Sequence, residues 1–340
     1  MVDTVDPHVL VIAEVGVNHN GDLRRALLLI DEASRSGADV VKFQSFSAAA
    51  LASPSTPKVP YQRLGAEGES HADMLARLEL SETDMVRVKD HCEAQGVEFM
   101  STPYGVPEVA FLHDIGVRRF KVASADMVDE PLHSAIAATG RPCIASTGMA
   151  SRGEVERVVA IYRAANVELT LLHTTSAYPT SLPDANMRHL VELARNHGCD
   201  VGFSDHTQSN VAAIMAVALG ARVIEKHITL DREDSGPDHR ASADPGQFAA
   251  YVRCIRDAEQ ALGVHGYLRS PDEEQMAQTS RKSLHASRTL PVGRLIEASD
   301  VVLRRPGTGY LWRDLPMLAR YRTQVAIEAG EMLEPNHFGL

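Results

Sequence analysis

The chain has 340 residues, of which 44% are hydrophobic and 23% are charged, and this composition predicts a globular protein with a sizeable core. The formal net charge of −11 argues against binding to nucleic acid or to an anionic membrane surface, because both need a basic field. No apolar run approaches the roughly 20 residues that span a bilayer, and the first residues lack the basic and apolar pattern of a secretion signal, so we expect none. Four scattered cysteines without a CxxC pair are typical of reduced thiols, so we expect a cytoplasmic protein.

Eight times along the chain, a short apolar run stops at a polar or charged residue, and helical segments separate the runs. Glycines that end a helix, such as Gly37, lead directly into the next run, which favours parallel strand–helix units. The predicted strands cover residues 9–13, 40–41, 97–100, 117–122, 143–145, 169–172, 201–203 and 223–224. Eight repeats of a strand and a helix predict a (β/α)8 TIM barrel, in which the carboxyl ends of the strands meet at one mouth.

Helices and loops are predicted between these strands. The sequence predicts an amphipathic helix over residues 23–36, a polar loop at 231–245 and a further helix at 246–262. Residues 45–80, rich in Ser, Pro and Gly, form a long excursion after the second predicted strand. In a barrel this excursion lies at the catalytic mouth, so it is either a substrate loop or a solvated insertion.

The character of the sequence changes after the barrel. We expect a catalytic barrel over residues 1–265, a linker at 266–281 and a small, mainly β domain at 282–340. In the last segment, strand-like runs at 283–287, 301–304 and 323–327 alternate with turns. About sixty residues are few for an independent core, so this domain is expected to pack against something.

Two histidines, His206 and His227, follow the seventh and eighth predicted strands, which are neighbours in a barrel. Two imidazoles at adjacent strand ends can share one divalent ion and leave other positions open for water or substrate. Ser204, Asp205 and His206 do not form a hydrolase triad, because consecutive strand residues point to opposite faces. A metal site at the mouth is therefore the prediction for these two histidines.

Two lysines, Lys42 and Lys121, end the second and fourth predicted strands. A lysine in such a place is either a Schiff-base nucleophile or an anchor for an anion. Hydroxyl donors at other strand ends favour a site for a small, doubly anionic substrate, and these donors are Thr102, Ser124, Ser146 and Ser204. Candidate acids and bases near the same mouth are Glu14, Glu225 and Asp238.

Ordered motifs run along nearly the whole chain. They are IAEVGVNHNG at 12–21, KFQ at 42–44, STP at 101–103, STGM at 146–149, GFSDHT at 202–207, EKH at 225–227, GPDH at 236–239 and RRPGTG at 304–309. Together these motifs resemble the sialic acid synthase (NeuB) family, whose members make N-acetylneuraminic, legionaminic or pseudaminic acid. The last motif is similar to that of the C-terminal antifreeze-like (SAF) domain of the family.

The resemblance implies a condensation of phosphoenolpyruvate with the open-chain aldehyde of an N-acylated hexosamine, which gives a nine-carbon 2-keto acid and phosphate. By analogy, His206 and His227 would hold a divalent ion, Mn²⁺ or alternatively Mg²⁺ or Co²⁺. Phosphoenolpyruvate would be held by Lys42, Thr102, Lys121, Ser124, Ser146 and Ser204, and the sugar by Gln44, Asp126, Ser176 and Tyr178. The essential carboxylates of the family match Glu14, Glu225 and Asp238.

The resemblance also implies a homodimer. Arg305 matches the position from which the family's small domain reaches the N-acyl group of the sugar. In the family, this domain crosses into the barrel of the partner chain. Each active site would therefore need two chains.

Departures from the family pattern lie at the sugar end of the site. Ser176 stands where some members have Asn, Asp126 stands where Glu is common, and the tail reads GYLW at 309–312. They leave the sugar open between N-acetylmannosamine and a 2,4-diacetamido-2,4,6-trideoxyhexose. Two other hypotheses also stay open, a Schiff-base pyruvate aldolase on the same barrel and a non-catalytic carbohydrate-binding protein.

Overall fold

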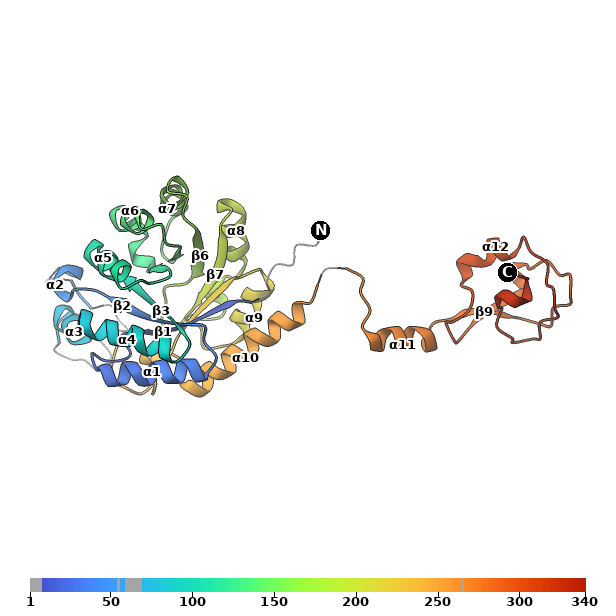
Figure 1. Cartoon of the computed structure of the whole chain (residues 1–340), viewed down its shortest axis with the longest axis horizontal. Coiled ribbons are helices and arrows are strands. Elements are labelled where there is room, and N and C mark those ends of the chain that lie inside the picture. Colours follow the sequence, from blue (N-terminus) through green and yellow to red (C-terminus); the bar gives the residue numbers. More distant parts are fainter. Residues whose placement is uncertain (1–7, 54–55, 59–68, 265) are drawn as a thin grey trace. The chain divides into compact units, whose positions relative to one another are not determined.

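The computed structural model describes residues 8–53, 56–58, 69–264 and 266–340. The chain divides into two compact units, Met1–Gly263 and Val264–Leu340. In the first unit, strands lie at the centre and helices surround them (Figure 1). Within the described residues, no helix is both long enough and apolar enough to cross a membrane.

One sheet of eight strands forms the centre of the first unit, and its order is β3-β2-β1-β8-β7-β6-β5-β4. The strands are β1 (Leu10–Gly16), β2 (Val40–Ser45), β3 (Glu98–Pro103), β4 (Phe120–Val122), β5 (Cys143–Ser146), β6 (Leu169–Thr174), β7 (Asp200–Asp205) and β8 (Val223–His227). All hydrogen-bonded neighbours are parallel. The end strands β3 and β4 are in contact, which brings the sheet round into a ring. The predicted (β/α)8 barrel is confirmed.

An apolar floor fills the inside of the barrel. It consists of Ile12, Val40, Met100, Ile144, Leu172 and Val223, all buried. Gly202 completes this floor, because a Cβ there would lie only 2.3 Å from the Val223 carbonyl oxygen and 2.5 Å from Leu172 Cδ2. Alternate residues of a strand point to the same face. The residue two positions beyond each floor residue therefore also points inward, but nearer the mouth.

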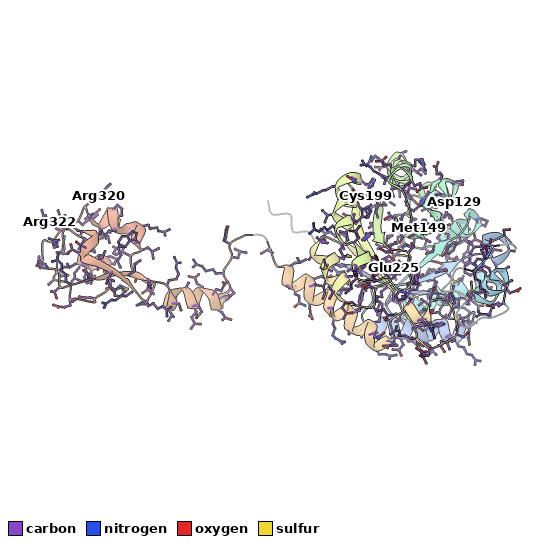
Figure 2. All side chains as sticks on the ribbon, turned by 180° about the vertical axis from the view of Figure 1, so that it is seen from behind. Asp129, Met149, Cys199, Glu225, Arg320 and Arg322 are labelled. Atoms are coloured by element: carbon purple, nitrogen blue, oxygen red, sulfur yellow. The ribbon has the colours of Figure 1, made fainter. Side chains whose placement is uncertain are left out.

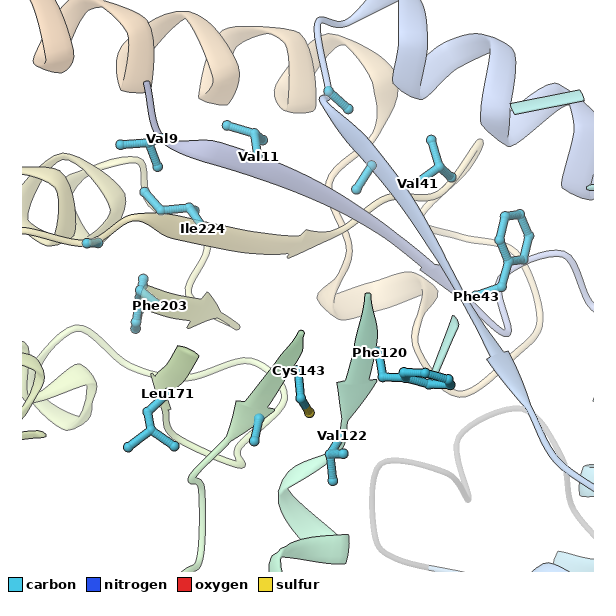
Figure 3. Close-up of a cluster of buried hydrophobic side chains, with 14 of the residues drawn as sticks. Val9, Val11, Val41, Phe43, Phe120, Val122, Cys143, Leu171, Phe203 and Ile224 are labelled. Carbon is cyan, nitrogen blue, oxygen red and sulfur yellow. The ribbon is translucent and has the colours of Figure 1, made fainter. Parts of the chain in front are cut away.

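The opposite face of the sheet carries a second set of apolar residues, which pack against the helices. Figure 3 shows members of this cluster, among them Val11, Val41, Phe120, Leu171 and Phe203. The surrounding helices are α1 (Leu23–Arg35), α4 (Glu82–Ala94), α5 (Val106–Asp114), α6 (Glu130–Ala138), α7 (Arg152–Ala164), α8 (Arg188–His197), α9 (Val211–Ala218) and α10 (Pro245–Leu262). The packing of this cluster against the helices holds the strands in place, and the strands in turn position the residues that point into the barrel.

Helix α1 illustrates why these segments become helices. The Asp22 side chain accepts a hydrogen bond from the Arg24 N–H and so caps the first turn. Its buried residues, Ala26, Leu29, Ile30 and Ala33, recur every three or four positions and form one apolar stripe.

The excursion after β2 contains α2 (Ala48–Leu51) and α3 (His71–Leu78). Met74, Leu75 and Leu78 of α3 form a small buried cluster with Val17 and Phe46, near the exits of β1 and β2. The described part of the predicted loop 45–80 is thus packed rather than freely solvated. Its segments 54–55 and 59–68 lie outside the described residues, so its role as a substrate loop stays a prediction.

The second unit contains α11 (Pro271–Ser280), β9 (Ser283–Ala286), β10 (Val301–Arg304) and α12 (Leu315–Leu318). Strands β9 and β10 are antiparallel, and the unit has its own buried cluster, which includes Leu284, Leu318 and Phe338. The predicted strand at 323–327 is wrong. Its neighbourhood makes only isolated bridges, Leu290 with Ile327 and Leu295 with Arg322, because two loops rather than two strands meet there.

Candidate active site

A polar layer lies directly above the apolar floor of the barrel. Its members stand two residues beyond a floor residue on the same strand and are buried: Glu14, Lys42, Thr102, Ser146, Thr174 and Glu225. Lys121 of β4 and Ser204 of β7 are also buried. The side chain of Glu225 lies within the barrel unit (Figure 2). The fold thus brings together charged residues that are up to about two hundred positions apart, as barrel geometry requires.

Two lysines and two glutamates form the centre of this layer. Lys42 Nζ lies 2.8 Å from Glu14 Oε2 and 3.7 Å from Glu225 Oε2, and Lys121 Nζ lies 3.9 Å from Glu225 Oε1. All four side chains are at most 6% exposed. Their formal charges cancel, so the buried group is close to neutral before any ligand binds.

Burial sets the protonation of these groups, and the neighbours modify it. Burial raises the pKa of Glu14 to about 7, even though Lys42 opposes the rise. Burial lowers the pKa of Lys121 to about 8, although Glu225 favours the ammonium form. Burial disfavours the charged form of Glu225, but Lys121 and Lys42 outweigh it and lower the pKa of this carboxyl. Glu225 is therefore the permanent anion of the group, while Glu14 and Lys121 titrate nearer neutrality.

Hydroxyl groups lie beside the lysines and beside Glu225. Lys121 Nζ donates to Ser146 Oγ at 2.6 Å, and Lys42 Nζ donates to Thr102 Oγ1 at 3.1 Å. Ser204 Oγ donates to Glu225 Oε1 at 3.3 Å. Two predicted hydroxyls thus lie beside the two cations, and the third, Ser204, lies beside Glu225. Cations and hydroxyls together can bind a phosphate or carboxylate group.

Gly148 brings two further predicted residues to the same place. Its N–H donates to Ser124 Oγ at 3.1 Å. A Cβ at this position would lie 2.5 Å from Ser176 Oγ and 2.8 Å from Ser124 Oγ, so a larger residue would have to displace these hydroxyls. The two hydroxyls lie close together because both pack against the backbone at Gly148. The motif STGM contains this glycine, but the sequence alone does not reveal its role.

The two predicted metal ligands lie side by side. The ring centroids of His206 and His227 are 5.7 Å apart, a separation that one ion can bridge when each nitrogen lies about 2.1 Å from it. Burial lowers the pKa of both imidazoles, so both are neutral, the form that binds metals.

The partners of the ring nitrogens also fit a metal ion. His206 Nδ1 lies 2.9 Å from the Thr175 carbonyl oxygen, which leaves Nε2 free to act as a ligand. His227 Nδ1 is buried and has no hydrogen-bond partner in the described part of the chain. No three His, Cys, Asp or Glu side chains gather as a complete ligand set among the described residues. Two imidazoles would therefore leave several positions of an ion open.

The loop after β8 carries the third predicted carboxylate. Asp238 Oδ2 lies 4.0 Å from His227 Nδ1, and burial raises the pKa of Asp238 to about 6. Ser242 Oγ donates to the Asp238 carbonyl oxygen at 2.7 Å, and Asn18 Nδ2 donates to Ser242 Oγ at 2.8 Å. Asn18 thus helps to fix Asp238 from the loop after the neighbouring strand β1. Sequence reasoning missed this role, although the motif at 12–21 contains the residue.

The residues predicted for the sugar are placed as follows. Gln44 Nε2 donates to Glu14 Oε1 at 3.1 Å, and the ring of Tyr178 lies 4.1 Å from that of His206. Asp126 lies in the 3-10 turn η2 (Ser124–Val128), where burial raises its pKa to about 6. Its Oδ2 has no hydrogen-bond partner among the residues that the structure describes. Arg305 is exposed and belongs to the second unit, so the barrel unit alone does not contain it.

Asp205 and Lys226 lie on the outer face of the barrel. Lys226 Nζ is 3.2 Å from Asp205 Oδ2, and the Tyr251 hydroxyl donates to the same oxygen at 2.8 Å. Asp205 therefore points away from Ser204 and His206, and the exclusion of a hydrolase triad is confirmed.

Comparison with known proteins agrees with this geometry. The chain matches the NeuB family over residues 29–267 and the SAF domain over residues 281–339. It is 38% identical to the N,N'-diacetyllegionaminic acid synthase of Legionella pneumophila, over 96% of this chain and 94% of that protein. It is 32% identical to a pseudaminic acid synthase of Campylobacter jejuni, over 98% of this chain and 97% of that protein.

Among solved structures, the fold is similar to that of an N-acetylneuraminic acid synthetase from Leptospira borgpetersenii, crystallised in complex with citrate. The TM-score is 0.70 at 32% sequence identity, and the match covers 79% of this chain and 90% of that one. Family match, sequence identity and fold agree, and they confirm the predicted resemblance. The chain belongs to the NeuB family and carries a C-terminal SAF domain.

Proposed function

We propose that this protein is a sialic acid-type synthase, which condenses phosphoenolpyruvate with the open-chain aldehyde of an N-acylated hexosamine. The observation that carries the proposal is the juxtaposition of two neutral imidazoles with a buried group of two lysines and two glutamates. The family match supports it, because the named relatives are synthases of nine-carbon acidic sugars. The alternative of a non-catalytic carbohydrate-binding protein has no such support.

Phosphoenolpyruvate would lie on the cationic part of the layer. Lys121 with Ser146, and Lys42 with Thr102, offer two cation–hydroxyl pairs for its phosphate and carboxylate groups. The Ser124 hydroxyl beside the Gly148 amide and the Ser204 hydroxyl extend this set of donors. Since the four charges of the layer cancel, binding of this anion would favour uptake of a proton by Glu14, whose pKa is raised to about 7.

His206 and His227 would hold the divalent ion, for which we propose Mn²⁺, with Mg²⁺ or Co²⁺ as alternatives. A divalent ion bound there would act as a Lewis acid toward the aldehyde oxygen of the sugar. The close, tilted contact of the Tyr178 ring with His206 would keep the imidazole in its orientation.

The remaining steps use carboxyl groups as proton carriers. Carbon three of the enol bonds to the aldehyde carbon, and the aldehyde oxygen gains a proton. Water adds to carbon two and loses one proton, which leaves a hydroxyl on that carbon. This hydroxyl then loses its own proton as the keto group forms, the bond from carbon two to the phosphate oxygen breaks, and phosphate departs with that bond's electron pair. Glu14 and Asp238, with pKa values of about 7 and about 6, can both exchange these protons near neutral pH. Glu225 stays ionised and would stabilise the positive charge that develops at carbon two.

For the sugar, we propose a 2,4-diacetamido-2,4,6-trideoxyhexose ahead of N-acetylmannosamine. The 38% identity to a legionaminic acid synthase exceeds the 32% identity to an N-acetylneuraminic acid synthetase, and this difference supports the choice. The sugar would be contacted by Gln44, Asp126, Ser176 and Tyr178. Asp126 offers a carboxyl oxygen that has no hydrogen-bond partner within the described part of the chain.

We further propose a cytoplasmic homodimer in which Arg305 of the partner subunit completes each site. The support is the exposed position of Arg305 in a separate SAF unit. Arg305→Ala should raise the KM for the sugar much more than the KM for phosphoenolpyruvate. Equal sugar KM values in the variant and the wild type would contradict this role.

The proposed activity is tested by measuring phosphate release from phosphoenolpyruvate with a panel of hexosamines, followed by mass spectrometry of the products. The expected product is a nine-carbon 2-keto acid formed only when a divalent metal is present. No phosphate release with any N-acylated hexosamine in metal-containing buffer would overturn the proposal.

A second candidate is a Schiff-base aldolase that uses pyruvate. It is favoured by one observation, the lowering of the Lys121 pKa to about 8, because a desolvated lysine is a better nucleophile. Borohydride reduction in the presence of pyruvate distinguishes the two. A covalent adduct on Lys121, with activity that survives a chelator, would support the aldolase.

A further inference from the structure

A buried polar cluster lies on the outer face of the barrel wall, and we call it the outer cluster. It consists of Asp205 of β7, Lys226 of β8 and Tyr251 of α10, and none of the three is more than 7% exposed. Lys226 Nζ lies 3.2 Å from Asp205 Oδ2 and 5.0 Å from the centre of the Tyr251 ring. The Tyr251 hydroxyl donates to the same carboxylate oxygen at 2.8 Å. The proposed reaction uses none of these groups, so the burial of two charges here needs another explanation.

Two members of the outer cluster stand immediately before the proposed metal ligands. Asp205 precedes His206, and Lys226 precedes His227. The register of β7 with β8 ends at the pair of Asp205 with Lys226, so each histidine is the next residue beyond this last pair. The separation of the two imidazoles therefore depends on how firmly the last pair is held.

The outer cluster also holds the residue after His206. Asp205 Oδ1 accepts a hydrogen bond from the Thr207 N–H at 2.7 Å, and the Lys226 ammonium donates to the Thr207 carbonyl oxygen. His206 is thus enclosed between two residues that the outer cluster fixes, Asp205 and Thr207. Because Lys226 itself belongs to β8, one buried ion pair is attached to the backbone on both sides of the proposed metal site.

Stability alone does not account for a buried ion pair at this place. Taking two charges out of water is costly, and well-packed apolar residues in place of such a pair often give an equally stable protein. An ion pair with further hydrogen bonds does fix a geometry, because each bond has a preferred length and direction. Geometry matters here, since an ion shared by two imidazoles needs a nitrogen of each ring about 2.1 Å away.

We propose that the outer cluster sets the separation of His206 and His227, and with it the affinity of the site for a divalent ion. Its members are positioning residues, because they act through the backbone of β7 and β8 from outside the barrel wall. The inference rests on the metal site of the proposed function. Residues that orient metal ligands commonly contribute about 10- to 100-fold to metal affinity. Since the outer cluster acts on the main chain rather than on the imidazoles directly, we expect about tenfold.

The test is titration of the metal-free full chain with Mn²⁺, followed by competition with a fluorescent chelator. The wild type is compared with Lys226→Met and Tyr251→Phe, and His206→Ala marks the signal without the site. The matched control is Tyr162→Phe. Tyr162 of α7 is as buried as Tyr251, and its hydroxyl lies 3.1 Å from His133 Nδ1 of α6. The control therefore also removes a buried hydroxyl outside the barrel wall, but one that is bonded to a helix and not to β7.

Lys226→Met should weaken Mn²⁺ binding about tenfold. Tyr251→Phe, which keeps the ion pair and loses one hydrogen bond, should weaken it about threefold. Tyr162→Phe should keep the wild-type Kd for Mn²⁺, although it loses a similar amount of stability in urea unfolding. A purely structural role of the outer cluster would lower stability without changing this Kd.

Circular dichroism checks that each variant is folded, and Tyr251→Phe still tests the inference if Lys226→Met does not fold. Unchanged Mn²⁺ affinity in the folded variants of the outer cluster would overturn the inference. So would an equal loss of affinity in Tyr162→Phe. In both cases the proposed function stands, as long as the wild type binds Mn²⁺ and His206→Ala does not. A wild type that binds no Mn²⁺ would overturn both the inference and the proposed metal site.

Discussion

Replacing Asp238 by asparagine separates the effect of its buried charge on stability from its effect on catalysis. Burial raises the pKa of Asp238 from 3.8 to about 6, and Lys42 only partly opposes this. At about 1.4 kcal/mol per pK unit, the ionised carboxylate destabilises the native state by about 3 kcal/mol. Asparagine resembles the protonated acid in shape and carries no charge, so Asp238→Asn should remove this cost.

The sign of the pH dependence follows from the raised pKa. Below the ordinary pKa of 3.8, the Asp238 carboxyl is protonated in both the folded and the unfolded state, so no buried charge destabilises the fold. The wild type loses stability relative to Asp238→Asn as pH rises from 3.8 to about 6, and the loss is complete above that pH. The variant should therefore be more stable by up to about 3 kcal/mol at pH 8, but by less than about 1 kcal/mol at pH 4. Its turnover should fall by about 10²-fold or more, because a proton carrier is lost.

The measurement is urea unfolding followed by far-UV circular dichroism at both pH values. The chain has one tryptophan, Trp312, which lies in the C-terminal unit, so its fluorescence reports on that unit separately. Glu233→Gln, an exposed residue on the same loop, is the control and should leave stability unchanged. A stability difference between Asp238→Asn and the wild type that is the same at pH 4 and pH 8 would refute the reasoning.

Three further predictions concern the site. His206→Ala should lose bound metal and nearly all turnover while keeping its circular dichroism spectrum, and full turnover of the metal-free variant would contradict the ligand assignment. The affinity for phosphoenolpyruvate should fall as pH rises through about 8, because Lys121 then loses its proton. The Kd of Lys121→Met for phosphoenolpyruvate should not change over this range. Identical profiles of Kd against pH in this variant and the wild type would exclude Lys121 as the titrating group. Gly148→Ala should raise substrate KM values at least tenfold, because its Cβ would displace Ser124 and Ser176. The control is Gly153→Ala, whose Cβ meets nothing closer than 3.8 Å and which should leave KM unchanged. Equal KM values in the two variants would show that the site tolerates the displacement.

Much of the barrel can be predicted from local patterns in the sequence. Parallel strands buried on both faces are short apolar runs, and glycines at helix ends mark where each run begins. Polar residues at the strand ends were predicted to converge, and Glu14, Lys42 and Glu225 do so. The strands of the C-terminal unit were harder to predict from the sequence, because few residues determine how these strands pair. The run at 323–327 has strand-like composition, but its Thr323 hydroxyl instead donates to the Pro291 carbonyl of a neighbouring loop.

Some features of the site required coordinates. The motif at 146–149 names Gly148, yet only the distances show that its backbone fits between Ser124 and Ser176. The contact from Asn18 through Ser242 to Asp238 joins residues more than two hundred positions apart, and no local pattern encodes it. The helix α11 within the predicted linker could have been foreseen, because Ser270 and Glu273 form a capping box.

The sequence alone determined the alternation of strands and helices, the family, and which side chains stand at the mouth, because these depend on spacing along one strand at a time. The tertiary structure decided which carboxylate forms an ion pair with which lysine. These ion pairs and the burial of the groups set the protonation of Glu14, Glu225 and Lys121. The physical reason is that pKa values depend on burial and on charges only a few ångströms away. Such distances arise between different strands and exist only once the ring has closed.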